Sequence, residues 1–406
     1  MDNKQRYFQT QSFIDYNPYE SLKKGAVATK IEMADIEPFT RNIKSSILSS
    51  YKGGTKFRNN DTILARITPC LENGKCAFIQ TLPNESIGFG STEFIVMRAV
   101  PGISIPLYIY YFALSPKFRE ITIKSLIGTS GRQRVQVDVL KNYCHSLPSL
   151  SVQKQIVSIL SSFDDKIEIN NKIIANLEAQ AQALYKSWFI DFDPFQDGEF
   201  QDSELGMIPK GWKIGLLSDI IEFNPSEKTT KNDNFFIDMK SLPTRGFIIS
   251  DISKKNKRSG MKFRNNDVLI ARITPCLENG KTGIVFGLPD EEVGIGSTEF
   301  IVMRGKHGKQ LSYCACTARN DKFRKYAVSH MNGTSGRQRV SASSLEEYSI
   351  VVPPALILKA FEEILGNSFQ MMENIRKQNQ ILAELRDTLL PKLMSGEIEL
   401  PDITED

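Results

Sequence analysis

A long internal repeat is the feature of this 406-residue sequence that most constrains its fold. Residues 56–98 and 262–304 align without a gap, and 30 of the 43 positions are identical. The stretch GTSGRQRV also occurs twice, at Gly128–Val135 and at Gly333–Val340. A chain that repeats itself over this length is expected to fold as two copies of one globular unit.

Each repeated region is followed by a stretch with coiled-coil periodicity, in which apolar positions alternate at spacings of three and four residues. That pattern is typical of the seam between two long helices. Each seam contains one asparagine, Asn170 or Asn379, which either fixes the register or partner of the helices or faces solvent at a local gap. The predicted seam residues are Leu160, Phe163, Ile167, Asn170, Ile174, Leu177, Leu184 and Trp188, then Leu365, Met372, Ile375, Asn379, Leu382, Leu389 and Leu393.

Within the globular regions the pattern changes to short strands and helices. Residues 62–67 and 93–97 are β-branched, apolar and bounded by turn residues, which predicts strands. Residues 107–114 and 116–126 are predicted to be helical. We therefore predict an α+β protein with a globular region at residues 1–150, a helical spacer at 151–195, a second globular region with its lead-in at 196–352, and a second helical spacer with an acidic tail at 353–406.

The charge is unevenly distributed along the chain. The overall net charge is only +4, but the two globular regions carry +7 and +6. Residues 151–200 and 353–406 carry −4 and −5. This distribution favours two modules that each bind a polyanion, with the acidic helices contacting other proteins.

Several classes of protein are excluded by what the sequence does not contain. It has no apolar run long enough to span a membrane and no secretory signal, so we predict a cytoplasmic protein with no membrane partner. Six cysteines form no Cys-x-x-Cys pair, and three histidines lie far apart, which argues against a zinc site. There is no phosphate-binding loop, amino-methyltransferase tetrapeptide or duplicated Ser/His/Asp set. We predict no catalytic residue, no metal site and no cofactor on this chain.

Three repeated motifs are candidates for DNA contact. In GTSGRQRV, glycines permit close backbone approach to phosphates, and arginine and glutamine suit base edges; the alternative is a solvated turn. The block RITPCLENGK forms a polar loop between strands, or alternatively a purely structural hairpin. The Ser-Thr-Glu corner offers a carboxylate that can accept from cytosine. The predicted DNA-binding residues are Arg58, Arg66, Thr68, Asn73, Lys75, Ser91, Thr92, Glu93, Ser130, Arg132, Gln133 and Arg134, with Arg264, Arg272, Thr274, Asn279, Lys281, Ser297, Thr298, Glu299, Ser335, Arg337, Gln338 and Arg339 in the second copy.

Two longer phrases carry a family resemblance. Residues 183–195 read ALYKSWFIDFDPF and lead into GMIPKGW at 206–212, and residues 389–398 read LLPKLMSGEI. Together with the duplicated plan, they resemble the specificity subunit of type I restriction–modification systems over essentially the whole chain.

The resemblance implies two similar α/β target-recognition domains separated by two long helices. The helices would pack as an antiparallel coiled coil with pseudo-two-fold symmetry and set the gap between half-sites. Two methylation subunits, which carry S-adenosylmethionine and flip out an adenine, would dock on this chain. Restriction subunits would supply cleavage that depends on ATP and Mg²⁺. The chain itself would bind double-stranded DNA and catalyse nothing.

Two further expectations concern the differences between the copies. Because the candidate reading motifs are the same in both, we predict a palindromic, interrupted site. Only about 13 residues precede Ile14, so the N-terminal approach segment is expected to be reduced, with the acidic tail Glu397–Asp406 partly replacing it. The alternatives are a two-headed DNA-binding regulator outside restriction, an enzyme with degenerate motifs, and a coiled-coil scaffold.

Overall fold

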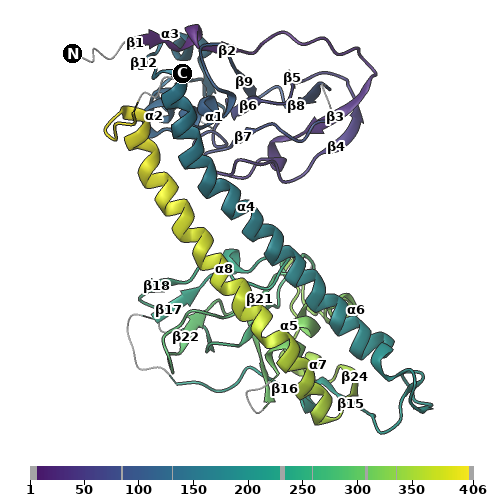
Figure 1. The fold of residues 1–406 in the computed structure, drawn as a ribbon. Coiled ribbons are helices and arrows are strands. Elements are labelled where there is room, and N and C mark those ends of the chain that lie inside the picture. The colour runs from purple at the N-terminus through teal and green to yellow at the C-terminus, as the bar shows by residue number, and fades with distance from the viewer. Residues whose placement is uncertain are drawn as a thin grey trace. The chain divides into compact units, whose positions relative to one another are not determined.

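A computed structural model describes residues 7–83, 86–129, 131–228, 234–257, 259–306, 310–334 and 336–401. The chain divides into two compact units, Met1–Glu168 with Gln380–Asp406, and Ile169–Asn379. Each unit contains one globular part and a portion of each long helix, α4 (Leu150–Lys186) and α8 (Ala355–Ser395) (Figure 1). We refer to the parts of the two units outside α4 and α8 as head 1 and head 2. Within the described ranges, no helix is both long and apolar enough to cross a membrane.

The two heads share most of their elements in the same order, but head 2 begins with an additional short hairpin, β13 (Phe200–Gln201) with β14 (Ile208–Pro209). Head 1 contains β1 (Tyr7–Gln9), β2 (Ile14–Tyr16), β3 (Val27–Ile31), β4 (Ile47–Ser50), β5 (Thr55–Phe57), β6 (Asp61–Ala65), β7 (Cys76–Phe78), β8 (Gly88–Gly90), β9 (Phe94–Ala99), α1 (Pro106–Leu114), α2 (Pro116–Lys124), β10 (Leu126–Ile127), β11 (Arg134–Val135), α3 (Val137–Asn142) and β12 (Cys144–Ser146). Head 2 contains β13 (Phe200–Gln201), β14 (Ile208–Pro209), β15 (Lys213–Leu216), β16 (Ile221–Phe223), β17 (Asn234–Ile237), β18 (Ser253–Lys255), β19 (Met261–Phe263), β20 (Val268–Ala271), β21 (Thr282–Ile284), β22 (Gly294–Gly296), β23 (Phe300–Gly305), α5 (Leu311–Arg319), α6 (Asp321–Ser329), α7 (Ala342–Glu346) and β24 (Ser349–Val352).

Each head is built on two four-stranded sheets. In head 1 the strand orders are β2-β9-β6-β7 and β4-β3-β8-β5, and in head 2 they are β16-β23-β20-β21 and β18-β17-β22-β19. The pairs β3–β8 and β17–β22 are parallel, and the other neighbouring strands in these sheets are antiparallel. The predicted α+β class, the strands near residues 62–67 and 93–97, and the two helices that follow are therefore confirmed.

Strand β6 shows why the central strands are apolar throughout. Successive side chains point to opposite faces of a sheet. Ile63 faces a core formed between the two sheets of head 1, whereas Leu64 faces a second core that includes α1 and the long helices. In head 2, Leu269 and Ile270 divide between the corresponding two cores in the same way. Both faces of the strand are covered, so no polar alternation appears in its sequence.

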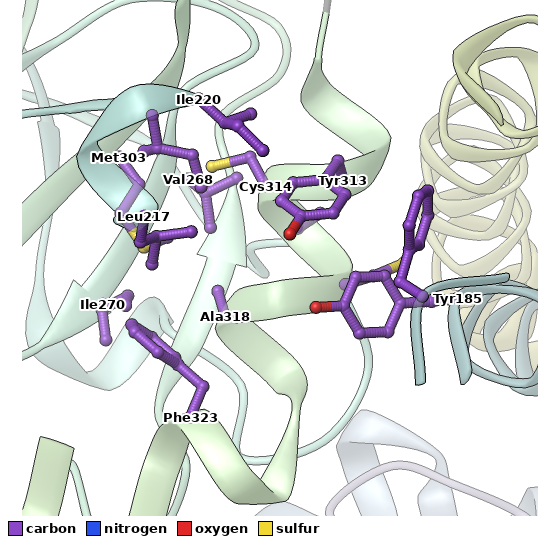
Figure 2. Close-up of a cluster of buried hydrophobic side chains, with 14 of the residues drawn as sticks. Tyr185, Leu217, Ile220, Val268, Ile270, Met303, Tyr313, Cys314, Ala318 and Phe323 are labelled. Carbon is purple, nitrogen blue, oxygen red and sulfur yellow. The ribbon is translucent and has the colours of Figure 1, made fainter. Parts of the chain in front are cut away.

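The long helices pack against each other within each unit. In the first unit, Ile156 and Leu160 of α4 share a core with Leu390 and Leu393 of α8. In the second, Tyr185 of α4 shares a core with α8 and with Tyr313 of α5, whose ring centroid lies 5.6 Å from its own (Figure 2). The start of α4 meets the end of α8, so the two helices run antiparallel. The fifteen predicted seam residues are all buried or half-buried.

The two seam asparagines contact each other in the second unit. Asn170 is 1% exposed, and its Nδ2 donates to Oδ1 of Asn379 at 2.7 Å and to Oε1 of Gln378 at 2.8 Å. Asn379 in turn donates to Oδ1 of Asn171 at 2.9 Å. Asn170 therefore does not face a solvent gap, and the amide pair satisfies polar groups at only one helical register.

A strand near the N-terminus occupies the place of the approach segment. Strand β1 pairs with β12 in head 1, as β15 pairs with β24 in head 2. In the first unit, Ile398 and Leu400 pack against the core that contains the end of α8, and both line a pocket that also includes Phe8 of β1. Ile398 and Leu400 thus lie beside β1, whereas residues 402–406 of the acidic tail lie outside the described residues, and the replacement of an N-terminal segment by this tail stays a prediction.

His145 gives head 1 a pH-dependent contribution to stability, and the corresponding strand of head 2 has no histidine at this position. Burial, and then the charge of Lys117, lower the pKa of His145 to about 4. Since the unfolded value is about 6.5, the unfolded chain binds the proton more tightly, and stability falls as the pH drops from about 6.5 toward 4. Head 2 has Ile350 at the equivalent place in β24.

The free energy of unfolding should fall between pH 7 and pH 5, and we expect His145→Ile to make this decrease smaller by about 1–3 kcal/mol. The measurement is the free energy of unfolding at pH 7 and pH 5. The exposed His330 provides a control, because His330→Ala should leave the difference between the two pH values unchanged. An undiminished difference in the His145→Ile variant would contradict the assignment.

Candidate nucleic-acid interface

Three neighbouring chain segments bring the repeated motifs of head 1 together. The backbone N–H of Arg66 donates to the carbonyl of Glu93, and the N–H of Val135 donates to the carbonyl of Arg66, both at 2.9 Å. In head 2 the same bonds join Arg272 to Glu299 at 2.9 Å and Val340 to Arg272 at 3.0 Å. The end of β6, the Ser-Thr-Glu corner and the GTSGRQRV segment are therefore fixed side by side in both heads.

A glutamate links two arginines at this place. In head 1, Nε of Arg134 donates to both carboxylate oxygens of Glu93 at 3.0 Å, and Nη2 donates to Oε1 at 2.7 Å. Nε of Arg66 lies 3.9 Å from Oε2 of the same carboxylate. This fork fixes the orientation of the Arg134 guanidinium and leaves its Nη1 without a hydrogen-bond partner among the described residues.

Head 2 repeats this geometry. Nε of Arg339 lies 3.0 and 2.9 Å from the two oxygens of Glu299, and Nη2 lies 2.6 Å from Oε1. Hydrogen bonding from Arg339, reinforced by the charge of Arg272, lowers the pKa of Glu299, so its carboxylate stays ionised at neutral pH. We call the following ten residues the recognition cluster: Arg66, Thr68, Glu93, Gln133 and Arg134 in head 1, and Arg272, Thr274, Glu299, Gln338 and Arg339 in head 2.

The threonine of each cluster anchors the glycine-rich loop. The N–H of Thr68 donates to the carbonyl of Gln133, and the N–H of Gln133 donates to Oγ1 of Thr68, both at 3.1 Å. Thr274 and Gln338 repeat this pair at 3.1 and 3.2 Å. Thr68 therefore has a structural role, and its contact with DNA stays a prediction.

Arg132 and Arg337 are the exposed arginines of this loop. The N–H of Arg132 donates to the carbonyl of Thr129, and that of Arg337 donates to the carbonyl of Thr334, both at 3.0 Å, which closes the turn. Neither guanidinium has a hydrogen-bond or ion-pair partner among the described residues. The backbone of both arginines is therefore held by hydrogen bonds, while their guanidinium groups are available to bind a ligand. Ser130 and Ser335, predicted beside them, lie outside the described residues.

Other predicted contacts are engaged within the protein. Nζ of Lys75 donates to the carbonyl of Met33 at 2.6 Å, and Nζ of Lys281 donates to that of Met239 at 2.8 Å. Oγ of Ser91 and of Ser297 accepts the N–H of the cluster glutamate at 3.1 Å. Arg264 pairs with Glu227 at 2.6 Å, and Arg58 lies 3.9 Å from Glu20. The predicted residues that are exposed without such a role are Asn73, Thr92, Asn279 and Thr298.

Asp61, an acidic residue at the start of β6, is fully engaged inside the protein. Both oxygens of Asp61 accept hydrogen bonds from Arg98 at 2.7 Å, and Asp61 is completely buried. Lys75 is directed to a backbone carbonyl. Across the described parts of the chain, no group of three or more His, Cys, Asp or Glu side chains is arranged to hold a metal ion.

Sequence reasoning missed two residues beside the head 1 cluster. Tyr19 and Lys56 line one pocket together with Arg66 and Thr92. Nζ of Lys56 lies 5.5 Å from the centre of the Tyr19 ring, which is 88% exposed. Lys56 has an identical counterpart in the repeat and was detectable there, whereas Tyr19 is replaced by a serine in head 2 and gave no signal.

One buried donor is unsatisfied at the same position in both heads. Nε of Arg66 and Nε of Arg272 have no hydrogen-bond partner among the described residues. A buried N–H without an acceptor is uncommon and costly.

Comparisons with known proteins find relatives over most of the chain. A family model described as "Type I restriction modification DNA specificity domain" matches residues 7–179 and 209–383. The chain is 28% identical to the type I restriction enzyme MjaIX specificity subunit of Methanocaldococcus jannaschii, covering 73% of this chain and 70% of that protein. It is 22% identical to the HindI specificity subunit of Haemophilus influenzae, covering 84% and 87%.

Solved structures agree on the fold. The crystal structure of a type I restriction–modification system S subunit from M. genitalium superposes with a TM-score of 0.54 and 15% identity. The match covers all of this chain and 98% of that one. At this identity the likeness concerns the arrangement of the backbone, which supports two similar α/β domains joined to long helices.

Proposed function

The chain belongs to the family of type I restriction–modification DNA specificity domains and is a specificity subunit of such a system, and we propose that each head reads one half of a bipartite DNA site. The observation that carries the proposal is the recognition cluster, which occurs in both heads with nearly equal distances. The basic charge of both globular regions is suited to the DNA backbone. The comparisons give no support to a regulator outside restriction.

The residues of each cluster and the neighbouring arginine of the glycine-rich loop divide into positioning and contacting groups. Glu93 and Glu299 orient Arg134 and Arg339, because both carboxylate oxygens are already engaged by these guanidinium groups. Arg132 and Arg337 contact bases or phosphates, because they are exposed and free. Arginine paired in two places to guanine is the commonest specific base contact in the major groove.

Specificity subunits of type I systems bind DNA and act in complexes with methylation and restriction subunits. We propose that two methylation subunits dock partly on α4 and α8. In the second unit, Ile364 and Met371 of α8 are about half exposed and one heptad apart. In the first unit, Ile381 and Leu385 are similarly exposed and one helical turn apart. Apolar side chains at such spacing suit a protein surface rather than DNA.

The chemistry is assigned to those partners. Methylation requires S-adenosylmethionine on the methylation subunits, and cleavage requires ATP and Mg²⁺ on the restriction subunits. This chain supplies recognition and no catalytic group. Purified chain alone should therefore show no turnover with DNA, Mg²⁺ and S-adenosylmethionine.

Co-purification followed by methylome mapping tests the proposal. The chain should co-purify with a methyltransferase, and long-read sequencing should locate modified adenines in an interrupted palindrome. The half-sites should be centred about one or more helical turns apart, since equal heads read equal sequences on opposite strands. A strain lacking this chain is the control and should lose both modifications. Two unrelated half-sites would refute the palindrome, and a chain that purifies without any methyltransferase would refute the assignment.

A further inference from the structure

The two heads differ in charge at the edge of one sheet. Strand β18 of head 2 and the residues after it read Ser253-Lys-Lys-Asn-Lys257, and the corresponding stretch of head 1 is Ile47-Leu-Ser-Ser-Tyr51. The register supports this equivalence: Ser49 pairs with Ala28 on β3, and Lys255 pairs with Asn234 on β17. Three lysines thus stand in a stretch that has no charge in head 1.

We infer that Lys255 and Lys257 form a phosphate-binding edge on head 2 that head 1 lacks. The inference rests on the proposed DNA-binding function and adds to it a contact outside the recognition cluster. It implies that the two heads share base recognition but contribute unequally to electrostatic binding.

A row of side chains connects this edge to the recognition cluster. Lys255 of β18 lies opposite Asn234 of β17. Phe236, also on β17, lies beside Ile295 of β22. Ile295 in turn lies opposite Lys262 of β19. Residues opposite each other, and residues two apart on one strand, share a face of the sheet. Lys262 corresponds to Lys56, which in head 1 lines a pocket with Arg66 and Thr92 of the candidate interface.

The separation matches the dimensions of DNA. Strand β22 ends at Gly296, immediately before the corner that supplies Glu299. Strand β18 lies two strands away, which is about 10 Å. The major groove is about 12 Å wide, so a cluster at the base edges places this edge near the phosphates that border the groove.

Both lysines are held in position, but Lys255 is partly neutralised by Asp238, and of the two only Lys257 has no acidic partner among the described residues. Nζ of Lys255 lies 4.6 Å and Nζ of Lys257 lies 4.5 Å from the centre of the Phe236 ring. The side chain of Asn234, which is buried, donates to the carbonyl of Lys257 at 2.7 Å and fixes its backbone. Lys255 also pairs with Asp238 at 3.1 Å, whereas Lys257 has no acidic partner among the described residues.

Head 1 has a different surface at the same place. Tyr51 packs edge-on against Phe89 with ring centroids 5.1 Å apart. Lys30, which occupies the position of Phe236, pairs with Glu32. Ser49 replaces Lys255. The row therefore offers no free ammonium at the edge of this sheet.

The test is the salt dependence of DNA binding by the full chain in complex with its methylation subunits. Fluorescence anisotropy would measure affinity for a duplex carrying the mapped site at several KCl concentrations. Lys255→Ser with Lys257→Tyr gives head 2 the side chains that head 1 already carries. This variant should reduce the slope of log K against log salt by about 0.9 for each phosphate that the lysines no longer neutralise. The reciprocal Ser49→Lys variant should increase it by about 0.9.

Lys254 provides a matched control on the same strand. Its Nζ lies over Phe235, 5.3 Å from the ring centre, and Phe235 packs against the core between the sheets. Lys254 therefore points to the opposite face, and Lys254→Leu should leave the slope unchanged. If the complex still binds its site specifically, an unchanged slope in the double variant would overturn the inference. A reduction of the same size in the Lys254→Leu variant would also overturn it. Failure of the unaltered complex to discriminate its site would instead overturn the proposed function.

Discussion

Replacement of Arg132 and Arg337 by alanine is expected to weaken specific DNA binding by about 1–3 kcal/mol for each head. These arginines lie in loops whose backbone is closed by hydrogen bonds, yet their guanidinium groups have no partner among the described residues. The variants remove no internal ion pair, so stability should change little. The double variant should lose about twice the free energy of a single variant, because the two sites lie in separate heads.

The measurement is a salt-controlled titration with the mapped duplex and with a scrambled one. Lys124→Ala serves as the control, because Lys124 is an exposed cation of head 1 that pairs with Glu120 outside the recognition cluster. That variant should affect both duplexes equally and weakly. Unchanged affinity for the mapped duplex in the Arg132→Ala and Arg337→Ala variants would remove these residues from recognition.

Removal of the buried carboxylate of Asp164 is expected to lower the free energy of unfolding by about 3–5 kcal/mol. Asp164 is 4% exposed and lies on the inner side of α4. Its Oδ1 accepts from Nη1 of Arg386 at 2.6 Å, and its Oδ2 accepts from the hydroxyl of Tyr111 at 2.7 Å. Asp164→Ala would leave the Arg386 guanidinium buried beside a cavity with only part of its charge balanced.

Urea denaturation of the purified chain would measure this effect. The adjacent Asp165 is a matched control: it pairs with Arg41 at 2.5 Å, but its side chain is 58% exposed. Arg41 is 5% exposed but keeps Glu168 as a second partner at 2.5 Å, so Asp165→Ala leaves no unpaired buried charge and should have a smaller effect than Asp164→Ala. Replacing Asp164 by Leu together with Arg386 by Met should recover much of the stability, since no isolated charge remains buried. Equal effects at positions 164 and 165 would contradict the argument.

Local patterns in the sequence predicted the outline of the fold. The repeat predicted two like heads, and the three-and-four spacing predicted two long helices that pack on each other. Strand alternation was invisible in β6, because both of its faces are buried, but its β-branched run and flanking turn residues still identified it. Helix and strand patterns depend on residues that are close together in the sequence, so they can be read from the sequence directly.

The candidate site was only partly predictable. The repeated motifs drew attention to Arg66, Glu93 and Arg134, but not to the fork in which Glu93 holds Arg134. Lys75 was assigned to DNA, and the structure directs it to the carbonyl of Met33. Its role in DNA contact stays a prediction, as do those of Asn73, Thr92 and their counterparts.

The sequence by itself determined the duplication, the helical seam and the separation of basic heads from acidic helices. Only the tertiary structure decided which charges are neutralised inside the protein and which remain free to bind. Glu93 meets Arg134 across 41 positions and Asp164 meets Arg386 across 222, and no local periodicity encodes either pair. Ionic partners are set by the register between distant segments, and that register exists only once the cores between sheets and helices have formed.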